Sequence, residues 1–177
     1  MVPIARRVAR AGRGRLAVFR LLNSVRGWDS HHTPVDDVRW ALSELTARFG
    51  HLPPTGLVGH SLGGRAALLA GDESGVRSVV ALNPWVYPAD GAALSGREIL
   101  IVHGSADRIA RPDRSASVAR RLARTASVSY VRVDGGKHSM LRRHEVFDAL
   151  ASDFTAKVLL RFDADFRDKP DERWRVA

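Results

Sequence analysis

Apolar positions along the chain follow two spacings, one typical of buried strands and the other typical of amphipathic helices. Short apolar runs predict five strands, over residues 16–22, 56–59, 76–82, 98–103 and 128–133. Between the first two runs, apolar side chains recur at the spacing of one helix face, at Val35, Val38, Leu42, Leu45 and Phe49. Thr33 is placed to cap that helix, and Pro34 suits its first turn. Further helices are predicted over residues 61–70, 112–124 and 143 to about 160.

Strands and helices therefore alternate along the chain. This alternation predicts an α/β fold with a mostly parallel sheet and helices on both of its faces. A chain of 177 residues with 45% hydrophobic composition is long enough for one packed core and short for two. We expect one domain over residues 1–162, followed by a charged C-terminal tail over residues 163–177 that frays.

Composition narrows the class of protein further. The chain has no cysteine, so it can form neither a disulfide framework nor a thiolate metal site. No apolar run approaches the roughly 20 residues that span a bilayer. The N-terminus also lacks the basic-then-apolar order of a secretory signal. We therefore expect a cytoplasmic protein with no membrane segment.

The formal net charge of +9 makes nucleic-acid binding an alternative to consider. The basic residues are almost all arginine and are spread along the chain, without zinc spacing, a recognition-helix pattern or interleaved aromatic residues. We expect no nucleic-acid partner, and the opposite view predicts salt-sensitive retention of DNA. The densest basic cluster could be a polybasic arm or a targeting helix, but a solvated helix face is favoured. It comprises Arg6, Arg7, Arg10, Arg13 and Arg15.

The stretch from Gly59 to Gly63, with Ser61 at its centre, has the pattern G-x-S-x-G between a predicted strand and a predicted helix. Glycines at these positions let the strand and helix backbones crowd around a serine held above the sheet. The pattern alone could mark a structural turn. In its strand-to-helix setting, it favours a nucleophilic serine over that alternative.

A nucleophilic serine needs a general base and a carboxylate that orients the base. Asp107 follows the predicted strand 98–103, and His138 follows the predicted strand 128–133 in a glycine-bearing loop. Both positions lie at the carboxyl end of a strand, where parallel sheets gather their functional groups. The chain order Ser, Asp, His also matches the order expected after such a turn.

Each of these residues has an alternative. Asp107 could be a turn former or a helix cap, and Asp113 could be the acid instead. His60, next to the serine, is expected to pack or to shape an acyl pocket rather than act as the base. His103 ends a strand and is expected to make backbone contacts. The adjacent His31 and His32 lack a metal-ligand spacing, so we expect no metal and no cofactor.

The motifs GHSLGG, HGSAD and GGKH, in this order, resemble the α/β-hydrolase superfamily, particularly its small lidless esterase-like and dienelactone-hydrolase-like members. The resemblance covers residues 4–160. It implies that Ser61 is the nucleophile, Asp107 the acid and His138 the base, with the Leu62 backbone N–H as one oxyanion-hole donor. It also suggests that the substrate pocket includes His60, together with two aromatic residues of the loop after residue 82. These are Trp85 and Tyr87.

The sequence departs from the family at its N-terminal end. The run over residues 16–22 resembles the family's fourth strand, and neither a third strand nor the His-Gly loop that supplies the second oxyanion donor precedes it. We expect a truncated α/β-hydrolase fold of about five strands. Either the chain begins after the family's first strands, or run 16–22 pairs directly with the strand before Ser61, or another chain fills the gap.

These observations predict a metal-independent serine hydrolase that cleaves an ester or thioester of a small-molecule acyl substrate through an acyl-enzyme. The alternative is a noncatalytic or truncated hydrolase-fold protein that acts as a ligand-binding module. Fold analogy cannot choose the substrate or its acyl-chain length. The oligomeric state is also left open.

Overall fold

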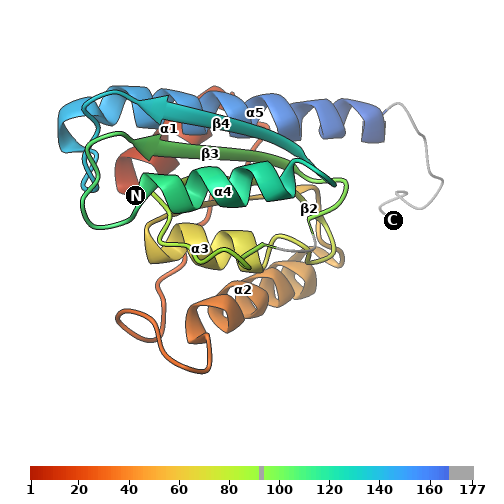
Figure 1. Ribbon diagram of the computed structural model, residues 1–177. Helices are drawn as coiled ribbons and strands as arrows, with labels where there is room; N and C mark the ends of the chain where they lie inside the picture. The colour runs from red at the N-terminus through yellow and green to blue at the C-terminus, as the bar shows by residue number, and fades with distance from the viewer. Residues whose placement is uncertain (92–93, 168–177) are drawn as a thin grey trace, which may run out of the picture.

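Four parallel strands form the central sheet of the computed structural model, which describes residues 1–91 and 94–167 (Figure 1). The strands lie side by side in chain order. They are β1 (Thr55–His60), β2 (Val76–Leu82), β3 (Glu98–Gly104) and β4 (Ser127–Val133). All three neighbouring pairs are parallel, so the carboxyl ends of the four strands meet at one edge. The predicted α/β class with a parallel sheet is confirmed.

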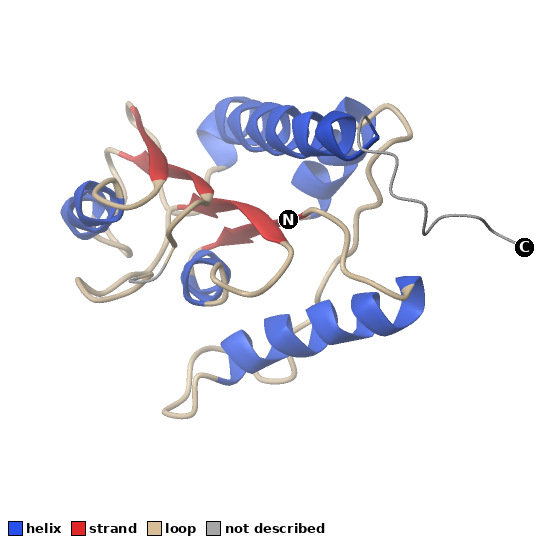
Figure 2. Cartoon of the chain, turned by 90° about the vertical axis from the view of Figure 1, so that its right-hand side faces the viewer, coloured by secondary structure: helices blue, strands red, loops and turns tan. Residues whose placement is uncertain are grey.

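Helices cover both faces of the sheet. On one face lie α2 (Thr33–Phe49), α3 (Leu62–Leu69) and α4 (Pro112–Leu122); on the other lie α1 (Val2–Ala11) and α5 (His144–Arg167) (Figures 1 and 2). The short 3₁₀ turn η1 (Leu141–Arg143) leads into α5. Alternate residues of β2 point to the two faces: Val79 belongs to the apolar cluster that includes side chains of α2, α3 and α4, whereas Val80 belongs to the cluster that includes side chains of α1 and α5. The period of two along a doubly covered strand produces this division.

Helix α1 packs against α5 through Ile4 and Val8, which are both buried. The arginines of the basic cluster are exposed, as a solvated helix face requires. The N-terminal basic segment is therefore a packed helix with a charged outer face.

The predicted strand over residues 16–22 is wrong. These residues have no strand pairing, and among the described strands β1 hydrogen bonds only to β2. A run of high β propensity becomes a strand only when a neighbouring strand accepts its backbone hydrogen bonds and covers its side chains. Here Phe19 packs edge-on against Phe49, and Leu22 is 80% exposed. Direct pairing of this run with the strand before Ser61 is therefore also wrong.

Two helix ends differ from their predictions. Helix α2 begins at Thr33 itself, after His32 in the left-handed region, and Thr33 donates its backbone N–H to Oδ1 of Asp29 at 2.9 Å. Asp29, rather than Thr33, thus satisfies a free donor of the first turn. Helix α5 continues to Arg167, five residues into the segment predicted as a tail, and the rest of that segment lies outside the described residues.

Candidate active site

Ser61 occupies a sharp turn between β1 and α3. Its φ of 55° and ψ of −119° are rare for a residue with a side chain. A Cβ atom at Gly59 would lie 2.1 Å from the carbonyl oxygen of Gly63, so only glycine allows the two backbones to cross here. The Ser61 N–H donates to the carbonyl of Leu82 at 3.0 Å. The serine is thereby fixed at the carboxyl end of β2.

Asp107 lies in the loop after β3 and is buried. Its Oδ1 accepts two backbone N–H groups, from Ile109 at 2.8 Å and from Ala110 at 3.0 Å. These bonds are those of a turn-forming aspartate, yet they use only one carboxylate oxygen. The other oxygen, Oδ2, faces two histidines, His138 and His103.

His138 lies in the loop after β4. This loop contacts the Asp107 loop through bare backbone, because Gly104 and Gly136 cross at a distance that excludes a side chain on either. The Ala106 N–H also donates to the carbonyl of Gly136 at 2.9 Å. The glycines of the motifs HGSAD and GGKH therefore bring Asp107 and His138 together.

Ser61, His138 and Asp107 form a continuous hydrogen-bonded chain. His138 Nε2 lies 2.9 Å from Ser61 Oγ, and His138 Nδ1 lies 2.8 Å from Asp107 Oδ2. An ionised carboxylate can only accept, so Nδ1 carries the proton and Nε2 presents its lone pair to the serine hydroxyl. This is the tautomer that a general base for Ser61 requires.

Two further side chains hold the His138 loop, a role that the sequence did not predict for either of them. Asn83, buried at the end of β2, donates from Nδ2 to the carbonyls of Lys137 and His138, and its Oδ1 accepts the Gly104 N–H at 2.8 Å. His60 Nε2 lies 2.8 Å from the His138 carbonyl oxygen, and the His60 ring packs against the His138 ring. A polar residue directly after the buried run 76–82 was the available signal for Asn83.

Comparison with solved structures places this arrangement in a known fold. One similar structure is an α/β serine hydrolase homologue from Coxiella burnetii, with 18% identity, a TM-score of 0.65, and coverage of 85% of this chain and 74% of that one. Another is a lidless α/β serine hydrolase from Xanthomonas campestris, with 20% identity, a TM-score of 0.65, and coverage of 88% and 73%. The chain has the α/β-hydrolase fold.

A third similar structure is the esterase domain of a Rhodothermus marinus protein, with 19% identity and a TM-score of 0.62. It is matched over 79% of its length by 89% of this chain. No protein-family model matches the sequence, and no curated protein matches it. At these identities the comparisons establish the fold of this chain and leave the role of its residues to the geometry.

Burial affects two histidines in and beside this candidate site. Burial lowers the pKa of His60 below its ordinary value, although the hydrogen bond to the His138 carbonyl opposes the shift. Burial likewise lowers the pKa of His103, against the opposing effects of the Ala110 carbonyl and of Asp107. Both imidazoles are therefore neutral near pH 7.

The predicted pocket aromatics lie on the loop after β2. Trp85 is exposed, and its backbone N–H donates to the Ser61 carbonyl at 3.1 Å, so its backbone adjoins the turn. The Tyr87 ring lies 4.6 Å from the Arg65 guanidinium, which also stacks on Trp28 and forms a buried ion pair with Asp90. Tyr87 thus belongs to an arginine-centred cluster, and its place in a substrate pocket stays a prediction.

The alternative acid is not part of the site. Asp113 lies in the first turn of α4, is exposed, and pairs with Arg111 at 2.7 Å. The hydrogen bond from Arg111 lowers the pKa of Asp113. Within residues 1–91 and 94–167, no group of three or more His, Asp or Glu side chains could hold a metal ion. No helix of this described part is long and apolar enough to cross a membrane.

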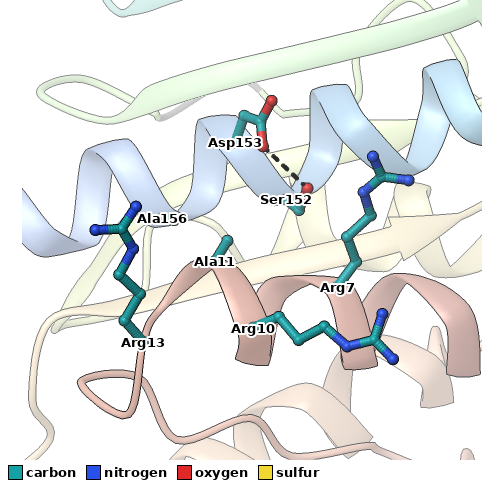
Figure 3. A pocket seen from close by; sticks show the side chains of 7 residues that line it. All are labelled: Arg7, Arg10, Ala11, Arg13, Ser152, Asp153 and Ala156. Carbon is teal, nitrogen blue, oxygen red and sulfur yellow. Dashed lines mark hydrogen bonds between the residues drawn. The ribbon is translucent and has the colours of Figure 1, made fainter.

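A cleft of about 650 Å³ opens elsewhere, between α1 and α5 (Figure 3). None of Ser61, Asp107 and His138 lines it. It is lined by Arg7, Arg10, Ala11, Arg13, Ser152, Asp153 and Ala156. Its chemistry is that of the exposed arginine face of α1, and it is separate from the serine.

Proposed function

We propose that this protein is a serine hydrolase that cleaves an ester or thioester through an acyl-enzyme. The observation that carries the proposal is the hydrogen-bonded chain from Ser61 through His138 to Asp107. A serine at an unusual φ, a histidine in the tautomer of a base, and a carboxylate fixed by backbone N–H groups have no common structural purpose. They have a common chemical one, which is nucleophilic catalysis.

In the acylation step, Ser61 Oγ attacks the carbonyl carbon while His138 Nε2 takes the hydroxyl proton. Asp107 holds the ring by accepting the Nδ1–H and stabilises the imidazolium that forms. Collapse of the tetrahedral intermediate breaks the bond to the leaving alcohol or thiol, which receives the proton from Nε2. The products of this step are the acylated Ser61 and the free leaving group.

Deacylation repeats the sequence with water. His138 Nε2 takes a proton from the water as its oxygen attacks the acyl carbon, and returns the proton to Ser61 Oγ as the acid leaves. The Leu62 N–H lies in the first turn of α3, where backbone donors have no intrahelical partner. We assign it as an oxyanion donor, because the negative charge develops beside this helix N-terminus.

Substrate class follows from chemistry and analogy together. One relative in fold is described as an esterase domain and another as a lidless serine hydrolase, and these descriptions support small acyl substrates reached without a cap. No cofactor or metal enters the steps above. We therefore propose a small-molecule acyl ester or thioester as the substrate.

One observation favours a second candidate, a noncatalytic ligand-binding module. Among the described strands β1 has a neighbour on one side only, and just one oxyanion donor can be assigned. Loss of one such donor typically costs about 10²- to 10³-fold in turnover, so weak hydrolysis would still separate an enzyme from a binding module.

Trapping of the acyl-enzyme tests the proposal. The protein is mixed with p-nitrophenyl acetate, quenched in acid, and analysed by intact mass and by peptide mapping. We expect a burst of nitrophenol and one acetyl group on Ser61, neither of which occurs in Ser61→Ala. Acetylation spread over surface lysines at the same rate in both proteins would favour the noncatalytic candidate.

A further inference from the structure

His103 is a fully buried histidine beside the proposed site, and the reaction scheme above does not use it. It lies near the carboxyl end of β3, and its side chain has no exposed surface. A buried imidazole must satisfy both ring nitrogens by hydrogen bonding or lose free energy. Its partners therefore reveal which nitrogen carries the proton.

The Nε2 atom of His103 faces two acceptors. It lies 3.2 Å from the carbonyl oxygen of Ala110 and 3.3 Å from Asp107 Oδ2. Neither a carbonyl nor an ionised carboxylate can donate, so a proton must sit on Nε2. That N–H is hydrogen bonded to the Ala110 carbonyl, and its nitrogen also lies close to the carboxylate oxygen that accepts His138 Nδ1–H.

The Nδ1 atom faces a hydroxyl. Ser115 Oγ lies 2.7 Å from Nδ1 and 2.9 Å from the carbonyl oxygen of Pro112. The Pro112 carbonyl also accepts a hydrogen bond from the Tyr130 hydroxyl at 3.2 Å. It therefore remains hydrogen bonded when the Ser115 hydroxyl donates to His103 instead. The polar groups of this cluster are thus satisfied with a neutral His103 protonated on Nε2.

We infer that His103 is a positioning residue, whose Nε2–H holds Oδ2 of Asp107 in the orientation that His138 requires. This inference rests on the proposed function of the Ser61 site. Backbone N–H groups fix only Oδ1. With His103 in place a donor lies beside Oδ2 as well, and rotation of the carboxylate away from His138 is opposed. Ser115 acts one step further out, because its hydroxyl can donate to Nδ1 of the His103 ring that is protonated on Nε2.

The titratable groups around His103 are Asp107, His138 and Tyr130. Removing the Nε2–H leaves a less stabilised Asp107 carboxylate, which attracts a proton on His138 more strongly. When His138 holds its proton more tightly, the deprotonated form that acts as the base is present only at higher pH. The pH profile of Ser61 reactivity therefore moves upward when the donor is lost.

Two variants separate this role from simple packing. The amide nitrogen of His103→Gln reaches the position of Nε2 and can donate to Asp107, whereas His103→Leu fills the space without a donor. The rate of reaction with a fluorophosphonate is measured from about pH 5 to 9, after a cooperative melt shows that each variant folds. We expect His103→Leu to react about 10- to 100-fold more slowly at pH 7, since bonds to charged groups contribute that much, with its inflection at higher pH. We expect His103→Gln to restore both values.

Equal rates and equal profiles for the wild type and a folded His103→Leu would overturn the inference. Nitrogen-15 NMR of the wild type gives an answer even if His103→Leu does not fold. It should show His103 neutral with its proton on Nε2 from pH 6 to 8, and a proton on Nδ1 alone would overturn the inference. Failure of the proposed function is distinguishable, because the wild type itself would then not react at Ser61.

Discussion

Gly104 and Gly136 lie so close that a Cβ atom on Gly104 would stand 2.3 Å from the carbonyl oxygen of Gly136. Gly104 ends β3 just before the loop that carries Asp107, and Gly136 belongs to the loop that carries His138. The distance between His138 and Asp107 therefore depends on the close approach of these two backbone segments as much as on the two side chains. At the Ser61 turn, likewise, a Cβ atom on Gly59 would stand 2.1 Å from the carbonyl oxygen of Gly63.

Gly104→Ala should therefore destabilise the protein and displace His138 from Asp107. The clash is with backbone and cannot be relieved by one rotamer change, so we expect a loss of about 2 kcal/mol or more in the free energy of unfolding, measured with urea. Gly63→Ala is the matched control, because a Cβ there meets nothing within 4 Å. A Gly104→Ala protein as stable as the control would contradict the packing described above.

The buried ion pair between Arg65 and Asp90, 2.8 Å apart, should matter more than exposed pairs. Arg65→Met leaves an uncompensated carboxylate that is largely buried, and we expect a cost of about 3 to 5 kcal/mol. Arg111→Gln breaks the exposed pair with Asp113 and should cost about 1 kcal/mol or less. Urea unfolding of both variants measures the two losses in the free energy of unfolding. Similar losses in the two variants would contradict the prediction.

Stability should fall when the pH drops below about 6.5, the ordinary histidine value. His60 and His103 have pKa values lowered by burial, so the unfolded chain binds more protons than the folded one in this range. The stability they contribute is present above the unfolded pKa and is lost as the pH falls through the folded values. Melting temperatures between pH 7.5 and 5.5 should show the decrease.

Replacing a buried histidine should reduce that decrease. His103→Gln removes one group with a lowered pKa and should flatten the curve. A slope unchanged by His103→Gln would mean that its folded and unfolded pKa values are equal.

The cleft between α1 and α5, which is lined by Arg7, Arg10 and Arg13, should take no part in the reaction of Ser61. A triple variant with glutamine at Arg7, Arg10 and Arg13 keeps Ile4 and Val8, which pack α1 against α5. We expect its fluorophosphonate labelling rate to equal that of the wild type. A loss greater than about tenfold in a folded triple variant would connect the cleft to the serine.

The sequence was informative where a local pattern determines the structure. Four strands and the helices over 33–49, 61–70 and 112–124 were predicted within about two residues, because their apolar faces are continuous. The run 16–22 has the same local character, yet a strand depends on a neighbour that local sequence does not report. The structure also brings Ser61, Asp107 and His138 together as their spacing suggested, and their catalytic role stays a prediction.

The sequence did not predict the side chains that hold the loops of these residues in place. Asn83 and His60 hold the His138 loop through bonds to its backbone, at separations of 55 and 78 residues along the chain. Such contacts depend on the order of strands in the sheet, which periodicity does not reveal. His103 lies at the end of an otherwise apolar strand. Its polarity indicates that a buried partner is needed, but the sequence does not identify that partner as the Asp107 loop.

Covalent labelling of Ser61 by a fluorophosphonate tests the central claim most directly, because it requires an activated serine and no knowledge of the substrate. In a protein that melts cooperatively, we expect label on Ser61 alone and none in Ser61→Ala. His138→Ala and Asp107→Asn should slow labelling by orders of magnitude, and His144→Ala and Asp113→Ala should change it little. A folded wild-type protein that does not label at Ser61, or labels equally in His138→Ala, would contradict the account.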